Sequence, residues 1–279
     1  MKLASVTVAY HPDINELCRN LASYANDVDV LLLWDNSEAP SDLSELQVKF
    51  PQLVVHQDGV NHGLPKPYNW AIDYAKEQGC THLMTMDQDS RFEDFHGYRQ
   101  WAETANHTGI SAIAINPTQP TSNEASWITC AGQSASIFPL DMLKEVGPFR
   151  EDLFIGMVDA EICLRAQEKG YKILQYNGSG LIHTVGSRRM VKFLGHPVMV
   201  SDYNALRHYY DSRNRILLWH EFPYDFNFKG KVHHLLGRMK VALKILLFEN
   251  KKWAKISAIV KGTYYGFRNR AVPYNKTVR

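Results

Sequence analysis

The chain lacks several features that would have fixed its class at once. Its four cysteines, at positions 18, 80, 130 and 163, are widely spaced and form no CxxC pair, which argues against a zinc knuckle or a thioredoxin-like site. It has no run of about 18 apolar residues that could span a membrane. The N-terminus shows no apolar stretch behind basic residues of the signal-peptide kind. We therefore expect a reduced, cytoplasmic protein with buried structural thiols.

A strong net charge is also missing. The formal charge of the 279 residues is +2, so the composition does not suggest a nucleic-acid partner. With 45% hydrophobic and 22% charged residues, the chain can bury the core of one large domain. The charge is uneven, however, because Glu249 is the one acidic residue after Lys229 among many lysines and arginines. We therefore expect a catalytic domain over residues 1–220 and a basic helical region over 221–279.

Short apolar runs alternate with helical patterns in the first 90 residues. Strand candidates lie at 3–10, 28–34, 53–57 and 82–86, and helical spacing occurs at 13–24 and 67–78. This alternation predicts an α/β fold with a mostly parallel central sheet flanked by helices. Beyond residue 90 we expect strands at 111–115, 134–139, 171–176 and 181–183, and helices at 160–169, 205–219 and 229–262.

Polar residues follow three of the predicted strands at the point where each strand ends. These clusters are Tyr10-His11, Asp35-Asn36-Ser37 and Asp87-Gln88-Asp89. In open sheets of this kind, ligands bind beyond the carboxyl ends of the strands. The three clusters therefore predict a binding crevice along one edge of the sheet.

Asp87-Gln88-Asp89 is the sharpest chemical signal in the chain. Two carboxylates one residue apart repel each other when buried, and a hard divalent cation such as Mn²⁺ or Mg²⁺ relieves the repulsion. Such an ion can hold a nucleotide diphosphate and stabilise it as a leaving group. The alternative is a turn whose aspartates cap a following helix, but the preceding strand and the neighbouring clusters favour the metal site.

Other polar residues near the strand ends are candidates for binding a nucleotide. Asp35 can accept hydrogen bonds from a base or ribose, although a plain Asx turn explains it equally well. Gly63 allows close backbone approach. Asn61 and Asn69 could line the crevice or simply cap the next helix.

A second acidic site begins at Asp159, close to the start of a predicted helix. A carboxylate here can act as a general base that removes a proton from an acceptor hydroxyl, with Glu161 in support. The alternatives are that Asp159 caps the helix and that Glu161 only pairs with Arg165.

His183 ends another strand candidate, and Arg188 follows it in a glycine-containing loop. A lone histidine is usually structural, but beside two carboxylates it is a candidate third metal ligand. Arginines nearby can support phosphate groups.

In their order along the chain, these motifs resemble the inverting family 2 glycosyltransferases with a GT-A fold, and most of all the bacterial rhamnosyltransferase branch. The matching segments are VAYHP at 8–12, LLWDNS at 32–37, NHGLPKPYNWAIDYAKEQG at 61–79, LMTMDQDS at 83–90, LFIGMVDAEICLRAQEKGYKI at 153–173, IHTVG at 182–186 and RHYYDSRNRILL at 207–218. The resemblance covers roughly residues 3–220 and is specific as an ordered set.

The resemblance implies a role for each candidate residue. It makes Asp159 the catalytic base and gives the metal and the diphosphate to Asp87, Asp89 and His183. The nucleotide-sugar contacts fall to Tyr10, Asp35, Asn61, Gly63, Asn69, Asp87, Gln88 and Arg188. It also implies a single displacement with inversion at the sugar.

The resemblance also suggests substrates. The leading donor is dTDP-rhamnose, and a UDP-hexose is the alternative. The acceptor is a glycan or a lipid-linked saccharide of bacterial surface polysaccharide synthesis.

Four positions depart from the resembled pattern. His11 stands where asparagine is common, and Val158 replaces an acid of the broader family, as the rhamnosyltransferase branch also does. Gly156 and Ile162 replace the first Asp and the Trp of the FIDYVDxEW pattern. The last two changes bear on donor or acceptor specificity more than on the class of reaction.

The basic region mixes lysines with leucines and isoleucines, which suits a helix lying on the inner face of a membrane. An amphipathic helix that packs on the catalytic domain is the alternative. A homo-oligomer is also compatible with the sequence.

Three other functions compete with the transferase. A haloacid-dehalogenase-type phosphohydrolase places its DxD after the first strand, and a sugar nucleotidyltransferase opens with a glycine-rich loop. Neither feature is present. A non-catalytic nucleotide-sugar-binding protein is the third, and the sequence excludes it poorly.

Overall fold

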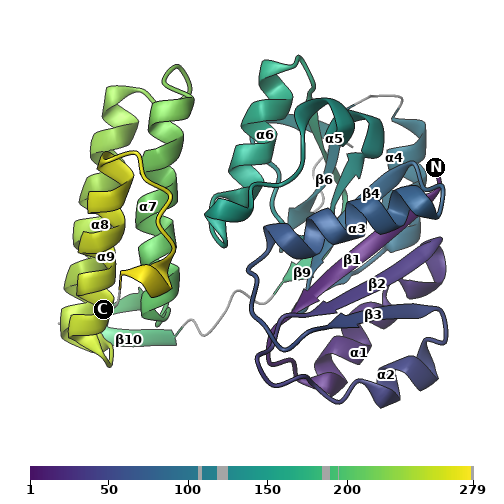
Figure 1. Cartoon of the computed structure of the whole chain (residues 1–279), viewed down its shortest axis with the longest axis horizontal. Coiled ribbons are helices and arrows are strands. Elements are labelled where there is room, and N and C mark those ends of the chain that lie inside the picture. The colour runs from purple at the N-terminus through teal and green to yellow at the C-terminus, as the bar shows by residue number, and fades with distance from the viewer. Residues whose placement is uncertain (106–108, 118–124, 184–188, 194, 278–279) are drawn as a thin grey trace. The chain divides into compact units, whose positions relative to one another are not determined.

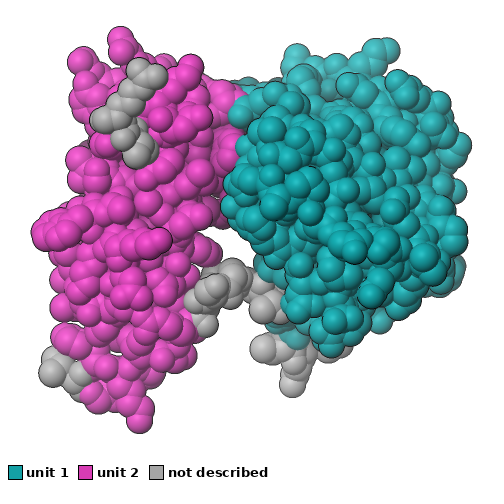
Figure 2. All heavy atoms as spheres, turned by 60° about the horizontal axis from the view of Figure 1, so that its bottom comes forward, with its two compact units in different colours: residues 1–151, 158–184 teal, residues 152–157, 185–279 magenta. Residues whose placement is uncertain are grey.

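The computed structural model describes residues 1–105, 109–117, 125–183, 189–193 and 195–277 (Figure 1). The chain forms two compact units, coloured separately in Figure 2. Unit 1 comprises residues 1–151 and 158–184, and unit 2 comprises residues 152–157 and 185–279.

Unit 1 is built on one nine-stranded sheet. Its order is β3-β2-β1-β4-β8-β6-β9-β5, and β7 pairs with β9. The strands are β1 (Leu3–Ala9), β2 (Val30–Asp35), β3 (Leu53–Gln57), β4 (His82–Asp87), β5 (Ser90–Phe92), β6 (Ile110–Ile115), β7 (Ala125–Ile128), β8 (Ser136–Pro139) and β9 (Ile173–His183).

The first four strands are parallel, as their alternation with helices predicts. The remainder of the sheet is mixed, because β8 runs antiparallel to both β4 and β6, and β9 pairs antiparallel with β5 and β7. The expectation of a mostly parallel sheet is therefore corrected. Antiparallel neighbours need no long helical crossover, and only two residues separate β4 from β5.

The two strands expected at 171–176 and 181–183 are one strand, β9. The glycines between them suggested a turn, but they lie in extended backbone, and the pairing with β6 shifts register between Ile113 and Ala114. This continuity carries the chain directly from the core of the sheet to His183.

Six α-helices accompany the sheet in the described part of unit 1. They are α1 (Ile14–Ala22), α2 (Ser44–Lys49), α3 (Pro65–Glu77), α4 (Phe95–Thr104), α5 (Leu140–Val146) and α6 (Val158–Glu168). Local chemistry sets several starts: the side chains of Asp13 and Asp94 accept backbone N–H groups at α1 and α4, and prolines open α3. Of the four thiols, only Cys80 and Cys163 are buried, so the expectation of buried thiols is wrong for Cys18 and Cys130.

Unit 2 holds a hairpin of β10 (Arg189–Phe193) and β11 (His196–Val200) and three helices, α7 (Ala205–Glu221), α8 (Phe228–Phe248) and α9 (Lys252–Phe267). The helical region expected at 229–262 is thus two helices, separated where Lys251 has a left-handed φ of 49°. Among the described residues, no helix is long and apolar enough to cross a membrane.

Helices α7 and α9 pack closely because two glycines lie between them. A Cβ atom on Gly262 would lie 2.3 Å from the Tyr209 carbonyl oxygen, and one on Gly266 would lie 2.8 Å from Ile216 Cβ. Helix α7 therefore belongs to unit 2, together with residues 152–157 and the rest of the chain from residue 185.

Two buried side chains of α7 hold the loop that leads to α6. Asn214 Nδ2 donates to the carbonyl oxygens of Leu153, Ile155 and Gly156 at 2.8–3.0 Å. Arg213, also fully buried, donates to the Asp152 carbonyl. These bonds satisfy backbone carbonyl groups in a loop that contains left-handed residues.

Candidate active site

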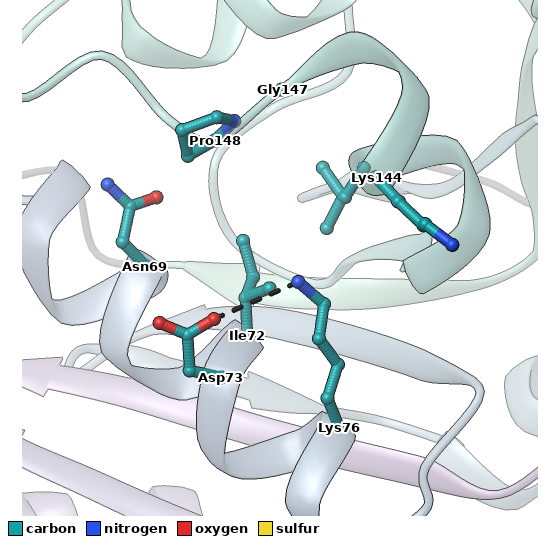
Figure 3. Close-up of a pocket in the computed structure, with 8 residues that line it drawn as sticks. Asn69, Ile72, Asp73, Lys76, Lys144, Gly147 and Pro148 are labelled. Carbon is teal, nitrogen blue, oxygen red and sulfur yellow. Dashed lines mark ion pairs between the residues drawn. The ribbon is translucent and has the colours of Figure 1, made fainter.

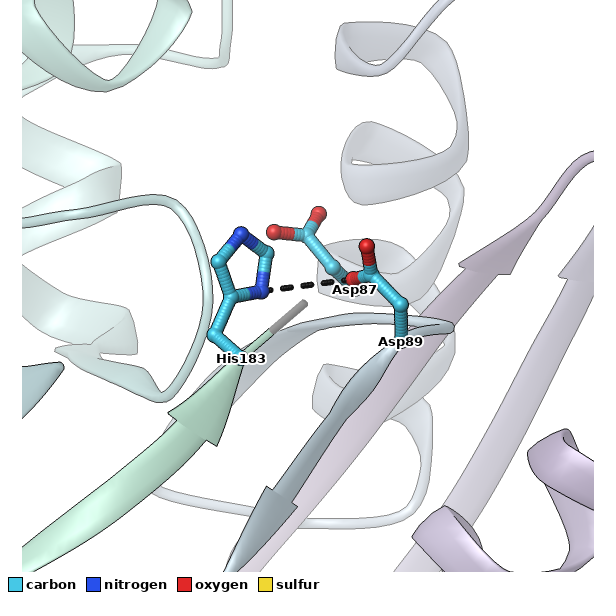
Figure 4. Close-up of side chains that lie close together, drawn as sticks. All are labelled: Asp87, Asp89 and His183. Carbon is cyan, nitrogen blue, oxygen red and sulfur yellow. Dashed lines mark ion pairs between the residues drawn. The ribbon is translucent and has the colours of Figure 1, made fainter. Parts of the chain in front are cut away.

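The antiparallel pairing of β5 with β9 creates the acidic cluster. Strand β4 ends at Asp87, β5 begins at Ser90, and the register places Ser90 opposite His183. Asp89, one residue before Ser90, therefore lies beside the imidazole. One ligand atom from each of Asp87, Asp89 and His183 lies within 4.8 Å of the others (Figure 4).

Hydrogen bonds fix the imidazole in this cluster. His183 Nδ1 lies 3.3 Å from Asp89 Oδ1 and 2.7 Å from Ser90 Oγ. Asn116 bonds to both the backbone N–H and the carbonyl of His183, at 3.0 and 2.8 Å. Asp87 is held through its own backbone N–H, which donates to Ser134 Oγ. The side chains thus approach each other from backbone that is itself anchored.

The cluster fits a divalent cation. Ligands on opposite sides of an octahedral Mg²⁺ are roughly 4 Å apart, since each bond is about 2.1 Å, so three atoms within 4.8 Å need little movement to share an ion. Two carboxylates and one imidazole suit Mn²⁺ or Mg²⁺. All three side chains are only partly buried, which leaves room for a ligand.

Asp159 lies within the first turn of α6, which begins at Val158. Its Oδ1 accepts the N–H of Ala160 at 2.9 Å. The helix therefore does not use Asp159 as its N-cap, and that alternative is removed. A carboxylate in the first turn is stabilised as an anion by the helix dipole.

Tyr68 on α3 is a candidate site residue that the sequence did not reveal. Burial is the main reason that its pKa is raised well above the ordinary value, and the charges of Asp87 and Asp159 raise it further. One buried hydroxyl thus lies within electrostatic reach of both acidic sites. It has no hydrogen-bond partner among the described residues. Its position on the buried face of a helix was the available signal, because a buried hydroxyl needs a partner.

Glu161 is buried and paired. Its two carboxylate oxygens accept from Arg165 Nε and Nη2 at 2.7 and 2.8 Å. The same guanidinium donates to the carbonyls of Val146, the last residue of α5, and of Pro148, two residues further on. This contact ties α6 to α5, so the geometry gives Glu161 a supporting part rather than a reacting one.

Tyr10, Gln88 and Asn61 lie close together. The Gln88 side chain accepts from the Tyr10 N–H at 2.6 Å and donates to its carbonyl at 3.3 Å. The Tyr10 hydroxyl donates to Glu38 at 3.2 Å and also contacts Asn61. The Tyr10 ring is 42% exposed, which leaves a face available for stacking on a planar ligand.

Asp35 is buried in its own hydrogen-bond network. Burial opposes its ionisation, but hydrogen bonds from Ser37, Ser41 and Gln57 outweigh burial and lower the pKa. The neighbouring Asn36 bonds to the Gly63 carbonyl at 2.8 Å. Asp35 therefore shapes the end of β2 as an ionised carboxylate, and its contact with a nucleoside stays a prediction.

Asn69 connects α3 to Phe149 and Glu151, which precede the loop at residues 152–157. Its amide exchanges two hydrogen bonds with the backbone of Phe149 and donates to Glu151. Asn69 also lines a pocket of about 350 Å³ between α3 and the end of α5 (Figure 3). That pocket contains none of the acidic cluster. Arg188 lies outside the described residues.

The mixed sheet, with its acidic cluster at a strand end, is the GT-A glycosyltransferase fold, as the sequence predicts. GalNAc-T7, solved with UDP, GalNAc and Mn²⁺, matches 70% of this chain with a TM-score of 0.56 and 14% identity. TarS of S. aureus in complex with UDP matches 96% of it with a TM-score of 0.54 and 16% identity. This chain spans 44% of the GalNAc-T7 chain and 72% of that TarS chain.

Sequence comparison gives a more particular relative. The dTDP-rhamnosyl transferase RfbF of Shigella flexneri is 24% identical over 238 residues, which are 77% of this chain and 78% of the relative. No family model matches the chain. The homologue and the shared fold together support a glycosyltransferase, and the relative is a distant one.

Proposed function

We propose that the chain is an inverting, metal-dependent glycosyltransferase that moves rhamnose from dTDP-rhamnose to a hydroxyl of a glycan or lipid-linked saccharide in bacterial surface polysaccharide synthesis. The observation that carries the proposal is the convergence of Asp87, Asp89 and His183 in a GT-A fold. The rhamnose donor rests on the relative, which is named as a dTDP-rhamnosyl transferase.

In this reaction Asp159 accepts the proton of the acceptor hydroxyl. The freed oxygen electron pair forms a bond to the anomeric carbon, and the bond from that carbon to the diphosphate oxygen breaks. Its electrons leave with the nucleoside diphosphate, and the sugar is inverted in one displacement. A cation held by Asp87, Asp89 and His183 would neutralise the diphosphate charge. Tyr10 and Gln88 are proposed to contact the nucleoside, with Asn61 and Gly63 beside them.

A thermal-shift screen tests the donor site. Ligands that bind the native state raise the melting temperature by mass action, so dTDP-rhamnose with Mn²⁺ is expected to raise it by several degrees. Asp89→Ala should abolish the metal-dependent shift. Asp94→Ala is the matched control, because Asp94 only caps α4. A shift with UDP-sugars and not with dTDP species would replace the donor by a UDP-hexose, and the absence of any shift would contradict the proposal.

The second candidate is a nucleotide-sugar-binding protein without catalysis. Tyr68 lies near both acidic sites, which favours a reacting centre over a binding site alone. Asp159→Asn separates the two functions: a transferase loses turnover and keeps donor affinity, whereas a binding protein shows no turnover to lose.

We also propose that unit 2 contacts an anionic membrane surface. Large apolar side chains stay exposed along α8 at helical spacing, and more follow on α9: Phe228, Val232, Leu236, Met239, Leu243, Leu247, Trp253, Val260, Tyr264 and Phe267. Lysines flank them, and cations beside an apolar face suit anionic headgroups. A second copy docked on this face would bring like charges together, so a lipid surface is favoured over a homo-oligomer.

Vesicle co-sedimentation tests this contact. Leu236→Glu and Leu243→Glu together should release the protein from phosphatidylglycerol vesicles. Val48→Glu is the control, since Val48 is 82% exposed on α2 in unit 1. Equal binding of all three proteins would contradict a membrane role for α8.

A further inference from the structure

The facing sides of α7 and α8 carry a cluster of basic side chains inside unit 2. Arg207, Asp211 and Arg215 are four residues apart on α7, and His234 and Arg238 are four residues apart on α8. Residues at this spacing share one face of a helix. The rings of Trp219 and His234 are 5.4 Å apart, which brings the end of α7 against the start of α8 (Figure 1).

Several side-chain nitrogens in this cluster have no hydrogen-bond partner among the described residues. Both ring nitrogens of His208, which is 1% exposed, lack a hydrogen-bond partner within the described part of the chain. The same holds there for His234 Nε2 and Arg238 Nη1. Arg207 Nε lies 3.3 Å from Asp211 Oδ1, without the geometry of a hydrogen bond. Buried donors without acceptors are rare in native proteins and need an explanation.

The cluster also has too little negative charge. Within the described residues, the charge of Asp211 interacts with those of Arg207, Arg238 and Arg215, and Asp211 is the carboxylate that acts on Arg238. Burial lowers the pKa of Arg238 and brings the pKa of His208 and of His234 down to about 4. Lys255, the cation of α9 that acts on His208, is already paired with Asp202 and Glu249 at 2.7 Å. One carboxylate thus faces three guanidinium groups.

We propose that the α7–α8 cluster, defined by Arg207, His208, Arg215, His234 and Arg238, binds a phosphate or diphosphate group. Guanidinium groups hold such anions through paired N–H donors, and the orphaned imidazole and guanidinium nitrogens are the donors available. While the site is empty, Asp211 would offset part of the repulsion between the arginines. The proposal does not depend on transferase activity.

Thermal shift with inorganic pyrophosphate, in the presence of EDTA, tests the site. EDTA removes divalent ions, so pyrophosphate cannot bind through a metal at Asp87 and Asp89. Pyrophosphate is expected to raise the melting temperature by several degrees, and Arg238→Gln to weaken its apparent affinity about tenfold or more. Lys240→Gln is the matched control, because Lys240 is an exposed cation on the same helix.

Two further arms identify the source of the phosphate. Free dTDP in EDTA probes a nucleotide, and vesicles containing a polyprenyl diphosphate, against phosphatidylglycerol vesicles of equal charge, probe a lipid-linked acceptor. Dependence on Arg238 in either arm supports the site and assigns its ligand. If circular dichroism shows that Arg238→Gln is unfolded, Arg207→Gln replaces it. No pyrophosphate shift, or a shift equal in Arg238→Gln and Lys240→Gln, would overturn the proposal whatever the sugar assay shows.

Discussion

The charged clusters of the two units have an excess of opposite sign. In unit 1, Asp87 and Asp89 share one imidazole, so negative charge is in excess. In unit 2, three arginines share Asp211, so positive charge is in excess. Like charges brought together in a partly buried site destabilise it unless one group becomes neutral or a ligand of the opposite sign binds. The comparison suggests a cation for unit 1 and an anion for unit 2.

The units also differ in how the charged groups are held. The acids of unit 1 lie at strand ends and in the first turn of α6, where backbone hydrogen bonds fix them. The cations of unit 2 project from helix faces, and two of their nitrogens, Arg207 Nε and Arg238 Nη1, have no hydrogen-bond partner among the described residues. This difference is consistent with the proposals above, which give the chemistry to unit 1 and anion binding to unit 2.

Asp159→Asn should have the largest effect. The substitution keeps the shape of the side chain and removes the proposed base, so kcat should fall about 10²–10⁴-fold while the donor-induced thermal shift is unchanged. Arg238→Gln, in unit 2, should change kcat far less at saturating substrate. Turnover measured at increasing acceptor concentration gives kcat for both variants. A larger loss of kcat in Arg238→Gln than in Asp159→Asn would contradict the assignment of chemistry to unit 1 and binding to unit 2.

Glu161→Ala tests the comparison in unit 1, because it removes one partner of the buried ion pair between Glu161 and Arg165. Glu161 is 1% exposed and bidentate to Arg165, so its removal leaves a partly buried guanidinium unpaired. We expect the free energy of unfolding to fall by about 3–5 kcal/mol. Urea unfolding measures it, with Glu168→Ala, on the exposed end of the same helix, as the control. A loss within about 0.5 kcal/mol, as for ordinary surface changes, would show that the pair is not structural.

Local pattern predicted most of unit 1. The parallel strands follow from short apolar runs, and Asp87 and Asp89 were found because they end such a run. His183 was a candidate ligand from its place at a strand end and from the resemblance, but its contact with the two acids depends on the antiparallel pairing of β5 with β9. Three residues of β5 carry too little periodicity to be predicted, so long-range pairing was beyond the sequence.

Unit 2 was predicted less well, for a physical reason. Helical spacing located α7, but it gave no sign that Gly262 and Gly266, which lack a Cβ, let α9 approach α7 closely. The orphaned donors of His208 and Arg238 also had no sequence signal. Such partnerships arise between helices distant in sequence, and spacing within one helix does not reveal them.

His208 makes stability depend on pH. Burial, aided by Arg238, Lys255 and Arg207, lowers its folded pKa to about 4 from the ordinary 6.5. Below pH 6.5 the imidazole is protonated in the unfolded chain but still neutral in the folded chain. The His208 contribution to the free energy of unfolding is therefore fully present above pH 6.5 and is lost as the pH falls towards 4. The loss is about 3 kcal/mol at most, at 1.36 kcal/mol per pKa unit.

Urea midpoints at several pH values between 7.5 and 4.5 check this dependence. His208→Gln should flatten it, and added pyrophosphate should also reduce it, because a bound anion favours the charged imidazole. His82→Gln, outside unit 2, is the control. If His208→Gln leaves the pH profile unchanged, His208 is not the cause of the pH dependence of stability.

Gly156→Ala should have the smallest effect. It tests the contact between Gly156, which replaces the first Asp of the resembled pattern, and Asp211. Gly156 has a φ of +76°, and a Cβ there would lie 2.5 Å from Asp211 Oδ1. The Asp211 carboxylate thus occupies the space of the missing side chain. Gly170 provides a matched control, since its φ is +85° but a Cβ on it would meet no atom within 4 Å.

Both substitutions carry the left-handed backbone cost, about 1–2 kcal/mol, and only Gly156→Ala adds the clash. We therefore expect Gly156→Ala to lower the free energy of unfolding by about 1 kcal/mol more than Gly170→Ala. Combining Gly156→Ala with Asp211→Ala should remove this difference, because the space is then free. If the difference persists in the double variant, the backbone alone requires glycine at position 156, and the carboxylate of Asp211 is not what fills its place.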